Sequence, residues 1–207
     1  MKKIIALLLL VAFYNLNAQE SNTRTNEIGL NVTSLINSVI DIGEDPATPD
    51  FNFFYRSIGA KTSYRLALQT RISNNKNDIG LSQEVKNNNR VLGLRFGVEG
   101  TKDLSKRFSL MYSWDFLVSQ NNAKSENENS GFTNKNNQLT IGTGPGLRIQ
   151  YDISDNISLM TESTFYAVYS KSTSKLEQFG QEEIETISSN FGTTSRMPTS
   201  IFITMRF

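Results

Sequence analysis

FSLMYSWDFLVS, residues 108–119, decides the fold, because apolar and polar side chains alternate along it. One face of the stretch carries Phe108, Leu110, Tyr112, Trp114, Phe116 and Val118. The other face carries mainly serine and aspartate. Successive side chains of a β-strand point to opposite sides, so a period of two predicts a strand with two unlike faces.

The same alternation recurs along the chain and predicts eight strands in all. They cover residues 27–35, 51–56, 64–72, 90–101, 108–119, 138–151, 157–170 and 196–207. The connections between them alternate strictly, with long ones at 36–50, 73–89, 120–137 and 171–195 and short ones between. Short turns on one side and long loops on the other are typical of an outer-membrane barrel. We therefore expect an all-β fold, an eight-stranded antiparallel up-and-down transmembrane β-barrel.

The first eighteen residues resemble a secretory signal peptide. Lys2 and Lys3 precede an apolar run that ends near Phe13, and the small residue Ala18 predicts cleavage just before Gln19. Residues 19–207 would then form one domain, with 19 basic and 20 acidic side chains once the two lysines are removed. This balance argues against nucleic acid as a partner.

The volume of a small barrel predicts which face points inward. An eight-stranded barrel has an interior that side chains fill, or that holds one small ligand. The aromatic side chains of the apolar face are too many for that space, so we expect them to face lipid. Some of them lie near predicted strand ends and fit interfacial aromatic girdles: Phe51, Phe108, Tyr151, Tyr169 and Phe207.

The closing segment SIFITMRF, residues 200–207, alternates and ends on an aromatic residue. With the signal peptide, the eight alternating strands and the unequal loops, it resembles the small outer-membrane β-barrel family of Gram-negative bacteria. The asparagine-rich loops add a resemblance to proteins of the Bacteroidota. In that family the barrel assembly machinery reads the last strand, which implies an assembly signal at Ile203, Met205 and Phe207.

The polar face predicts a network of charged side chains in the lumen. Its members are Glu27, Arg56, Arg65, Arg71, Arg95, Glu99, Asp115, Arg148, Glu162 and Arg206. Six arginines and four carboxylates in so narrow a space should pair, because burying either sign alone is costly. Two interpretations remain open, a structural ion network that fills the barrel and an arginine-rich lining that attracts anions.

Catalysis, cofactors and metals are not expected. The chain has no histidine and no cysteine, so no ordinary base and nucleophile pair is available near neutral pH. GTGPG at residues 142–146 lacks the lysine and the helix of a phosphate-binding loop. The acidic residues of 41–50 match no calcium-loop spacing.

These observations predict a scaffold in the outer membrane that anchors mobile extracellular loops, with lipid around it and an extracellular partner at the loops. The alternative is a narrow pore or transporter for small, anionic solutes. Among the loops, 171–195 is the most apolar. It predicts a strand extension, a short amphipathic helix or a partner surface.

Overall fold

The computed structural model describes residues 25–33, 51–60, 62–78, 84–127, 131–178 and 184–207. The predicted signal peptide and the acidic cluster of residues 41–50 lie outside these ranges. Within them, no helix is both long and apolar enough to cross a membrane.

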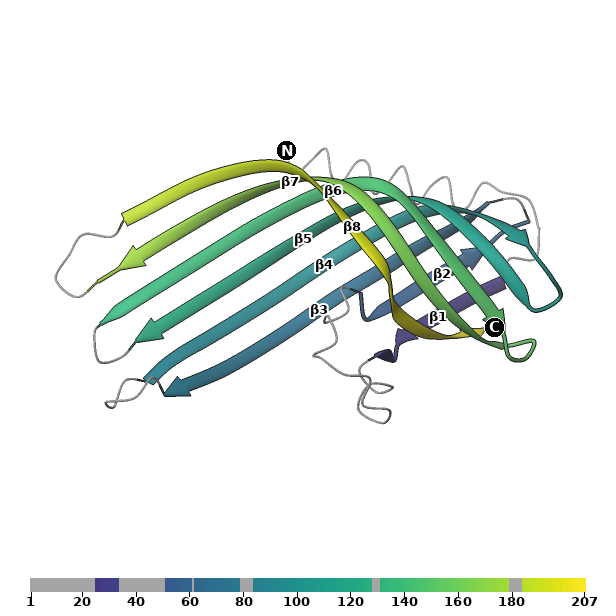
Figure 1. Cartoon of the computed structure of the whole chain (residues 1–207), viewed down its shortest axis with the longest axis horizontal. Helices are drawn as coiled ribbons and strands as arrows, with labels where there is room; N and C mark the ends of the chain where they lie inside the picture. Colours follow the sequence, from purple (N-terminus) through teal and green to yellow (C-terminus); the bar gives the residue numbers. More distant parts are fainter. Residues whose placement is uncertain (1–24, 34–50, 61, 79–83, 128–130, 179–183) are drawn as a thin grey trace.

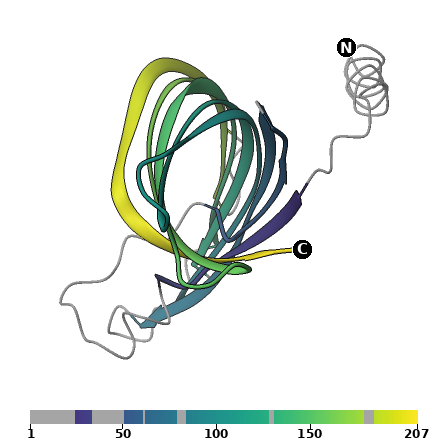
Figure 2. The same cartoon turned by 90° about the vertical axis from the view of Figure 1, so that its right-hand side faces the viewer.

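Eight strands follow one another around a closed antiparallel barrel (Figures 1 and 2). They are β1 (Thr25–Asn31), β2 (Phe53–Ile58), β3 (Ser63–Asp78), β4 (Glu84–Asp103), β5 (Phe108–Asn127), β6 (Phe132–Asp152), β7 (Ile157–Glu177) and β8 (Ile184–Arg206). Each strand pairs with its sequence neighbours, so the predicted up-and-down barrel is confirmed.

The last strand closes the ring against the first, as its alternation predicts. Glu27 of β1 lies opposite Arg206 of β8, and Leu30 lies opposite Ile203. Backbone hydrogen bonds extend the closure by one residue, because the Asn26 and Phe207 amides each donate to the other's carbonyl, at 3.0 and 2.9 Å. This pairing removes the open sheet edge at the end of the barrel where the chain closes.

The predicted strand ends were wrong on the side of the long connections. Most of 73–89, 120–137 and 171–195 is strand, and β5 and β6 remain paired from Phe108 and Tyr151 as far as Asn127 and Phe132. The polar composition of these segments indicates that their side chains are exposed to water. It does not prevent the backbone from pairing with a neighbouring strand, and among the three interpretations of 171–195 the strand extension is confirmed.

The strands differ greatly in length. β1 and β2 have 7 and 6 residues, whereas β3 to β8 have between 16 and 23. The full ring of eight strands therefore exists only near the short turns. Beyond it, the six longer strands continue as a curved wall, which extends to the left in Figure 1.

The two faces of the barrel wall differ as expected, with one correction. Large apolar side chains are exposed on the outside, including Trp114, Phe116 and Phe165. Phe51 was expected among them, but it is only 6% exposed. Because β2 begins at Phe53, the alternation does not extend back to Phe51, which instead packs in an apolar interior cluster. That cluster comprises Phe51, Phe54, Ala67, Met160 and Phe202.

Glycines on the inner face make room for neighbouring groups. A Cβ atom at Gly97 would lie 2.1 Å from Asp115 Oδ1, and one at Gly146 would lie 2.6 Å from Ser113 Oγ. At Gly144 the obstacle is the backbone itself, because a Cβ would lie 2.0 Å from the carbonyl oxygen of Phe165. The wall therefore leaves no space for a side chain at this position.

We expect Gly144→Ala to destabilise the barrel by about 1–3 kcal/mol, because a strand must shift to admit the methyl group. Gly192→Ala is the matched control, since nothing lies within 4 Å of its added Cβ. Urea unfolding of the refolded protein in detergent measures both. Equal midpoints for the two variants would contradict the close approach of β6 and β7.

Candidate functional site: an ion network across the lumen

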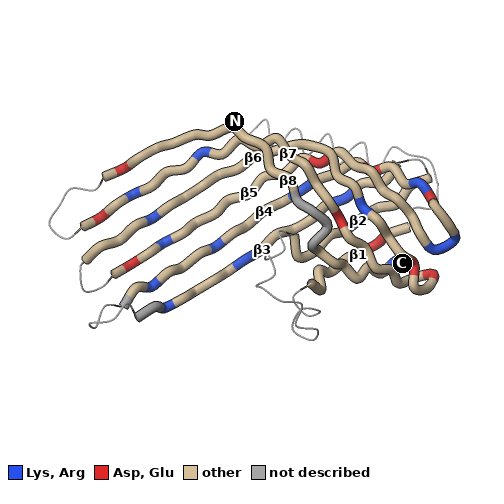
Figure 3. Tube along the Cα trace, in the orientation of Figure 1, with Lys and Arg blue, Asp and Glu red and all other residues tan. Residues whose placement is uncertain are grey.

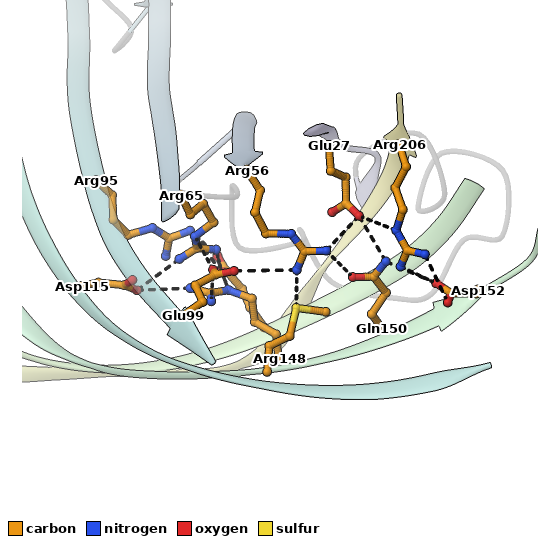
Figure 4. A network of polar contacts seen from close by, with 12 residues as sticks. Glu27, Arg56, Arg65, Arg95, Glu99, Asp115, Arg148, Gln150, Asp152 and Arg206 are labelled. Atoms are coloured by element: carbon orange, nitrogen blue, oxygen red, sulfur yellow. Dashed lines mark hydrogen bonds and ion pairs between the residues drawn. The ribbon is translucent and has the colours of Figure 1, made fainter. Parts of the chain in front are cut away.

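Ten charged side chains meet inside the barrel, and every strand supplies at least one of them (Figure 4). The cations are Arg56, Arg65, Arg95, Arg148 and Arg206. The carboxylates are Glu27, Glu99, Asp115, Asp152 and Glu162. Contacts such as Arg56 with Glu99 and Arg65 with Glu162 join strands that are not neighbours in the ring, so the network spans the lumen from wall to wall.

The first half of the network is built around Arg65 and Arg148, which share the same three carboxylates. Arg148 lies 2.5 Å from Glu99, 3.2 Å from Asp115 and 3.0 Å from Glu162. Arg65 reaches the same three groups at 3.1, 3.1 and 2.8 Å. Each arginine uses several of its guanidinium nitrogens, which the planar fork of donors makes possible.

Arg95 and Tyr166 complete this half. Arg95 contacts Glu162 at 2.9 Å and donates a hydrogen bond of 3.1 Å to the Tyr166 hydroxyl. That hydroxyl donates in turn to Asp115 at 2.8 Å. The Arg95 guanidinium also lies 4.2 Å from the centre of the Phe51 ring, a cation–π distance. The apolar cluster therefore covers the ion network directly.

The second half of the network lies toward the short turns. Glu27 contacts Arg56 at 2.8 Å and Arg206 at 3.1 Å. Gln150 contacts both members of the Glu27–Arg56 pair, because its side-chain oxygen accepts a hydrogen bond of 3.0 Å from Arg56 and its nitrogen donates one of 3.3 Å to Glu27. Arg206 also contacts Asp152 at 2.8 Å.

One ion pair joins the two halves, Arg56 with Glu99 at 3.7 Å. Arg56 also contacts the sulfur of Met111. The side chains of Arg65, Arg148, Glu27, Glu99 and Asp115 are at most 1% exposed. Charges so far from water are tolerated only when opposite charges compensate them closely, and equal numbers of each sign meet this condition.

Nine of the ten residues predicted for the lumen are brought together, and Arg71 is the exception. It has the inward parity of Arg65 on β3, but it is exposed and makes no ion pair with any residue that the structure describes. It lies on the part of β3 beyond the eight-stranded ring. Alternation predicts the face of a residue but not its depth along the axis.

Three network members were missed. Asp152 was assigned to a turn, although β6 continues through it. Gln150 shares the parity of Arg148, which could have identified it. Tyr166 was not named among the lumen residues, although its even position on β7 matches that of Glu162. With Asp152 included and Arg71 excluded, the network has no excess of arginine, so the alternative interpretation of an anion-attracting lining loses its basis.

A hollow of about 500 Å³ opens at the short-turn end of the lumen. Its lining includes Asp103, Lys106, Asp152 and Arg206 near the mouth. Arg56, Met111 and Gln150 also line it, and these three belong to the network or contact it. The hollow therefore leads directly to the side chains that fill the barrel.

Among the described residues, no group of three or more histidine, cysteine, aspartate or glutamate side chains could hold a metal ion. The carboxylates of the network already face arginines.

The residues of the expected assembly signal lie on the outside of the barrel. Ile203, Met205 and Phe207 have exposed side chains along the outer face of the closing strand and its end. Their recognition during assembly stays a prediction.

No protein-family model matches the chain, and no curated protein matches it. Among solved structures, it is similar to a major outer membrane protein from Thermus thermophilus, with 13% identity, a TM-score of 0.47, and coverage of 89% of this chain and 98% of that chain. It is also similar to CarO from Acinetobacter baumannii, with 9% identity, a TM-score of 0.39, and coverage of 89% and 96%. Both similarities are distant, and the fold assignment rests on strand pairing.

We expect Arg148→Gln to destabilise the folded barrel by about 3–5 kcal/mol, because three buried carboxylates lose a shared partner. Arg71→Gln removes an arginine of the same face that pairs with none of the described carboxylates, so its unfolding midpoint should match that of the original protein. Urea titrations followed by the fluorescence of Trp114, the single tryptophan, measure both. A midpoint for Arg148→Gln close to that of Arg71→Gln would show that the network is not structural.

Proposed function

We propose that the protein is an outer-membrane β-barrel that does not conduct and that serves as a scaffold for the wall of long strands projecting from the membrane. The observation that carries the proposal is the ion network, which crosses the lumen with equal numbers of opposite charges. An apolar layer lies against it, with the Phe54 and Phe202 rings 5.5 Å apart. Two successive layers thus fill the barrel.

The outer surface supports a place in a membrane. Bulky apolar side chains project from consecutive strands, and they are exposed although each would be buried in a soluble core. They include Leu66 on β3, Phe96 on β4, Phe116 on β5, Ile141 on β6, Phe165 on β7 and Ile203 on β8. A continuous exposed apolar band of this kind is expected where lipid replaces water.

The unequal ends of the barrel support an orientation. In such barrels the short turns lie on the periplasmic side and the long connections outside. The wall formed by β3 to β8 would then stand on the cell exterior, after export through the signal peptide at residues 1–18 and assembly through the last strand. Because this wall is paired β-structure, it would present a firm surface to an extracellular partner, rather than the mobile loops first expected.

Catalysis is not part of this proposal. The chain contains no histidine and no cysteine, and every carboxylate of the network contacts an arginine. A carboxylate that is held by arginine is a poor general base, because its charge is already stabilised.

Single-channel recording in planar bilayers tests the proposal, and we expect the refolded protein to insert without sustained conductance. The double variant Arg148→Ala with Glu162→Ala removes one charge of each sign from the filled lumen and should give small, brief openings. Arg71→Ala with Lys76→Ala is the control and should stay silent. A folded barrel runs differently on a gel before and after heating, and this shift verifies folding in every case.

Sustained conductance of the original protein would overturn the scaffold proposal and favour the narrow pore. Failure to insert, together with an absent gel shift, would overturn the membrane assignment itself.

A further inference from the structure

The outer face of the wall beyond the apolar band carries an unusual set of lysines. Lys124 of β5 lies directly opposite Lys135 of β6, and Lys135 lies directly opposite Lys175 of β7. Side chains in such positions have Cβ atoms about 5 Å apart, and like charges placed there are destabilising. Three lysines in one cross-strand row therefore lower the stability of the sheet unless anions compensate their charge.

These lysines point outward. Lys124 shares the parity of the exposed Phe116 and Val118, and Lys135 shares that of Leu139 and Ile141. The side chains of all three lysines are 41–45% exposed. They face the surroundings of the barrel, and the lumen network lies on the other side of the wall.

A hollow of about 620 Å³ lies over the same strands. The lysine row lines it together with Arg90, which makes no ion pair with any residue that the structure describes. Asn88 and Asn122 add amide donors beside these cations. Four cations and several amides around one hollow form a surface suited to an anion with several oxygens.

Acidic side chains are present nearby, but they lie at least as far from the apolar band. Lys124 contacts Glu126, while Lys135 and Lys175 contact Glu177 and Glu185 at 2.5 and 3.3 Å. Glu126 and Glu177 come closer to the hairpin ends of β5 and β7 than Lys124 and Lys175 do. Figure 3 shows blue and red positions along the outer part of these strands. Exposed ion pairs of this kind contribute about 0–1 kcal/mol, so an anion can compete for the lysines.

The height of the hollow relative to the apolar band identifies the anion. Arg90 lies two residues beyond the exposed Leu92, about 7 Å along β4, and Lys135 lies four residues beyond the exposed Leu139, about 14 Å along β6. A strand tilt of about 45° shortens these distances to about 5 and 10 Å along the membrane normal. The headgroup layer of a bilayer begins at the edge of the hydrocarbon and is about 5–8 Å thick. The cations therefore begin at the level of the lipid phosphates and extend outward from it.

From this placement we propose that the basic hollow formed by Arg90, Lys124, Lys135 and Lys175 binds the phosphorylated headgroup of an anionic lipid in the outer leaflet. The inference rests on the proposed membrane location. A headgroup with more than one phosphate fits best, because it could neutralise adjacent lysines of the row together. Binding would remove the like-charge repulsion and fix the barrel at a defined depth.

The test compares vesicles of phosphatidylcholine with vesicles that also contain the bisphosphorylated lipid A. We expect lipid A to raise the temperature at which the gel shift is lost, and high salt to reduce the effect. The variant Arg90→Gln/Lys124→Gln/Lys135→Gln/Lys175→Gln should lose most of this rise. In phosphatidylcholine alone it should be at least as stable as the original protein, since the repulsion is gone.

A second variant, Lys102→Gln/Lys106→Gln/Arg107→Gln, removes three cations near the short turns and should keep the full response to lipid A. Inorganic phosphate added to phosphatidylcholine vesicles should give no stabilisation. Equal responses of the hollow variant and the original protein would overturn the inference, as would a phosphate effect as large as that of lipid A. If the protein entered neither kind of vesicle, the membrane proposal would fail instead.

Discussion

Opposite charges in a lumen too narrow to hydrate them are the constraint on which the barrel depends. Each buried arginine must find carboxylates on other strands, so the contacts of Arg65 and Arg148 with Glu99, Asp115 and Glu162 fix the relative positions of β3 to β7. Inner-face glycines provide the space for these side chains. The strand register, the small residues and the charge balance are therefore consequences of one electrostatic requirement.

The alternation of the sequence was sufficient to predict the number of strands and which residues share a face. The connection lengths predicted the strand order, and the interior volume of a small barrel predicted which face points inward. The alternation could not predict depth, because a period of two is the same at every height of the barrel. Arg71 shows the limit, since it has the correct parity but lies on the part of β3 beyond the ring. Phe51 shows a second limit, because parity has no meaning before a strand begins.

The lengths of the strands were the least predictable feature. Asparagine, serine and lysine dominate the outer parts of β4 to β7, and such residues usually indicate loops. Here each segment has a paired neighbour on both sides, so the backbone hydrogen bonds form without a buried apolar face. Whether such a segment forms a strand depends on the neighbouring strands with which it pairs. The composition of the segment alone does not predict those partners.

The two faces of the wall arrange charge differently, with opposite charges paired across strands on the inside and like charges adjacent on the outside. Inside, Glu27 lies across from Arg56 and Arg206 and pairs with both, which stabilises the fold. Outside, Lys135 lies between Lys124 and Lys175 on adjacent strands, and repulsion among the three ammonium groups destabilises this part of the sheet. The carboxylates of Glu126, Glu177 and Glu185 compensate this repulsion only in part, because exposed ion pairs contribute little. Under the proposed orientation, an anionic membrane surface at that height would compensate the row further and turn the repulsion into binding.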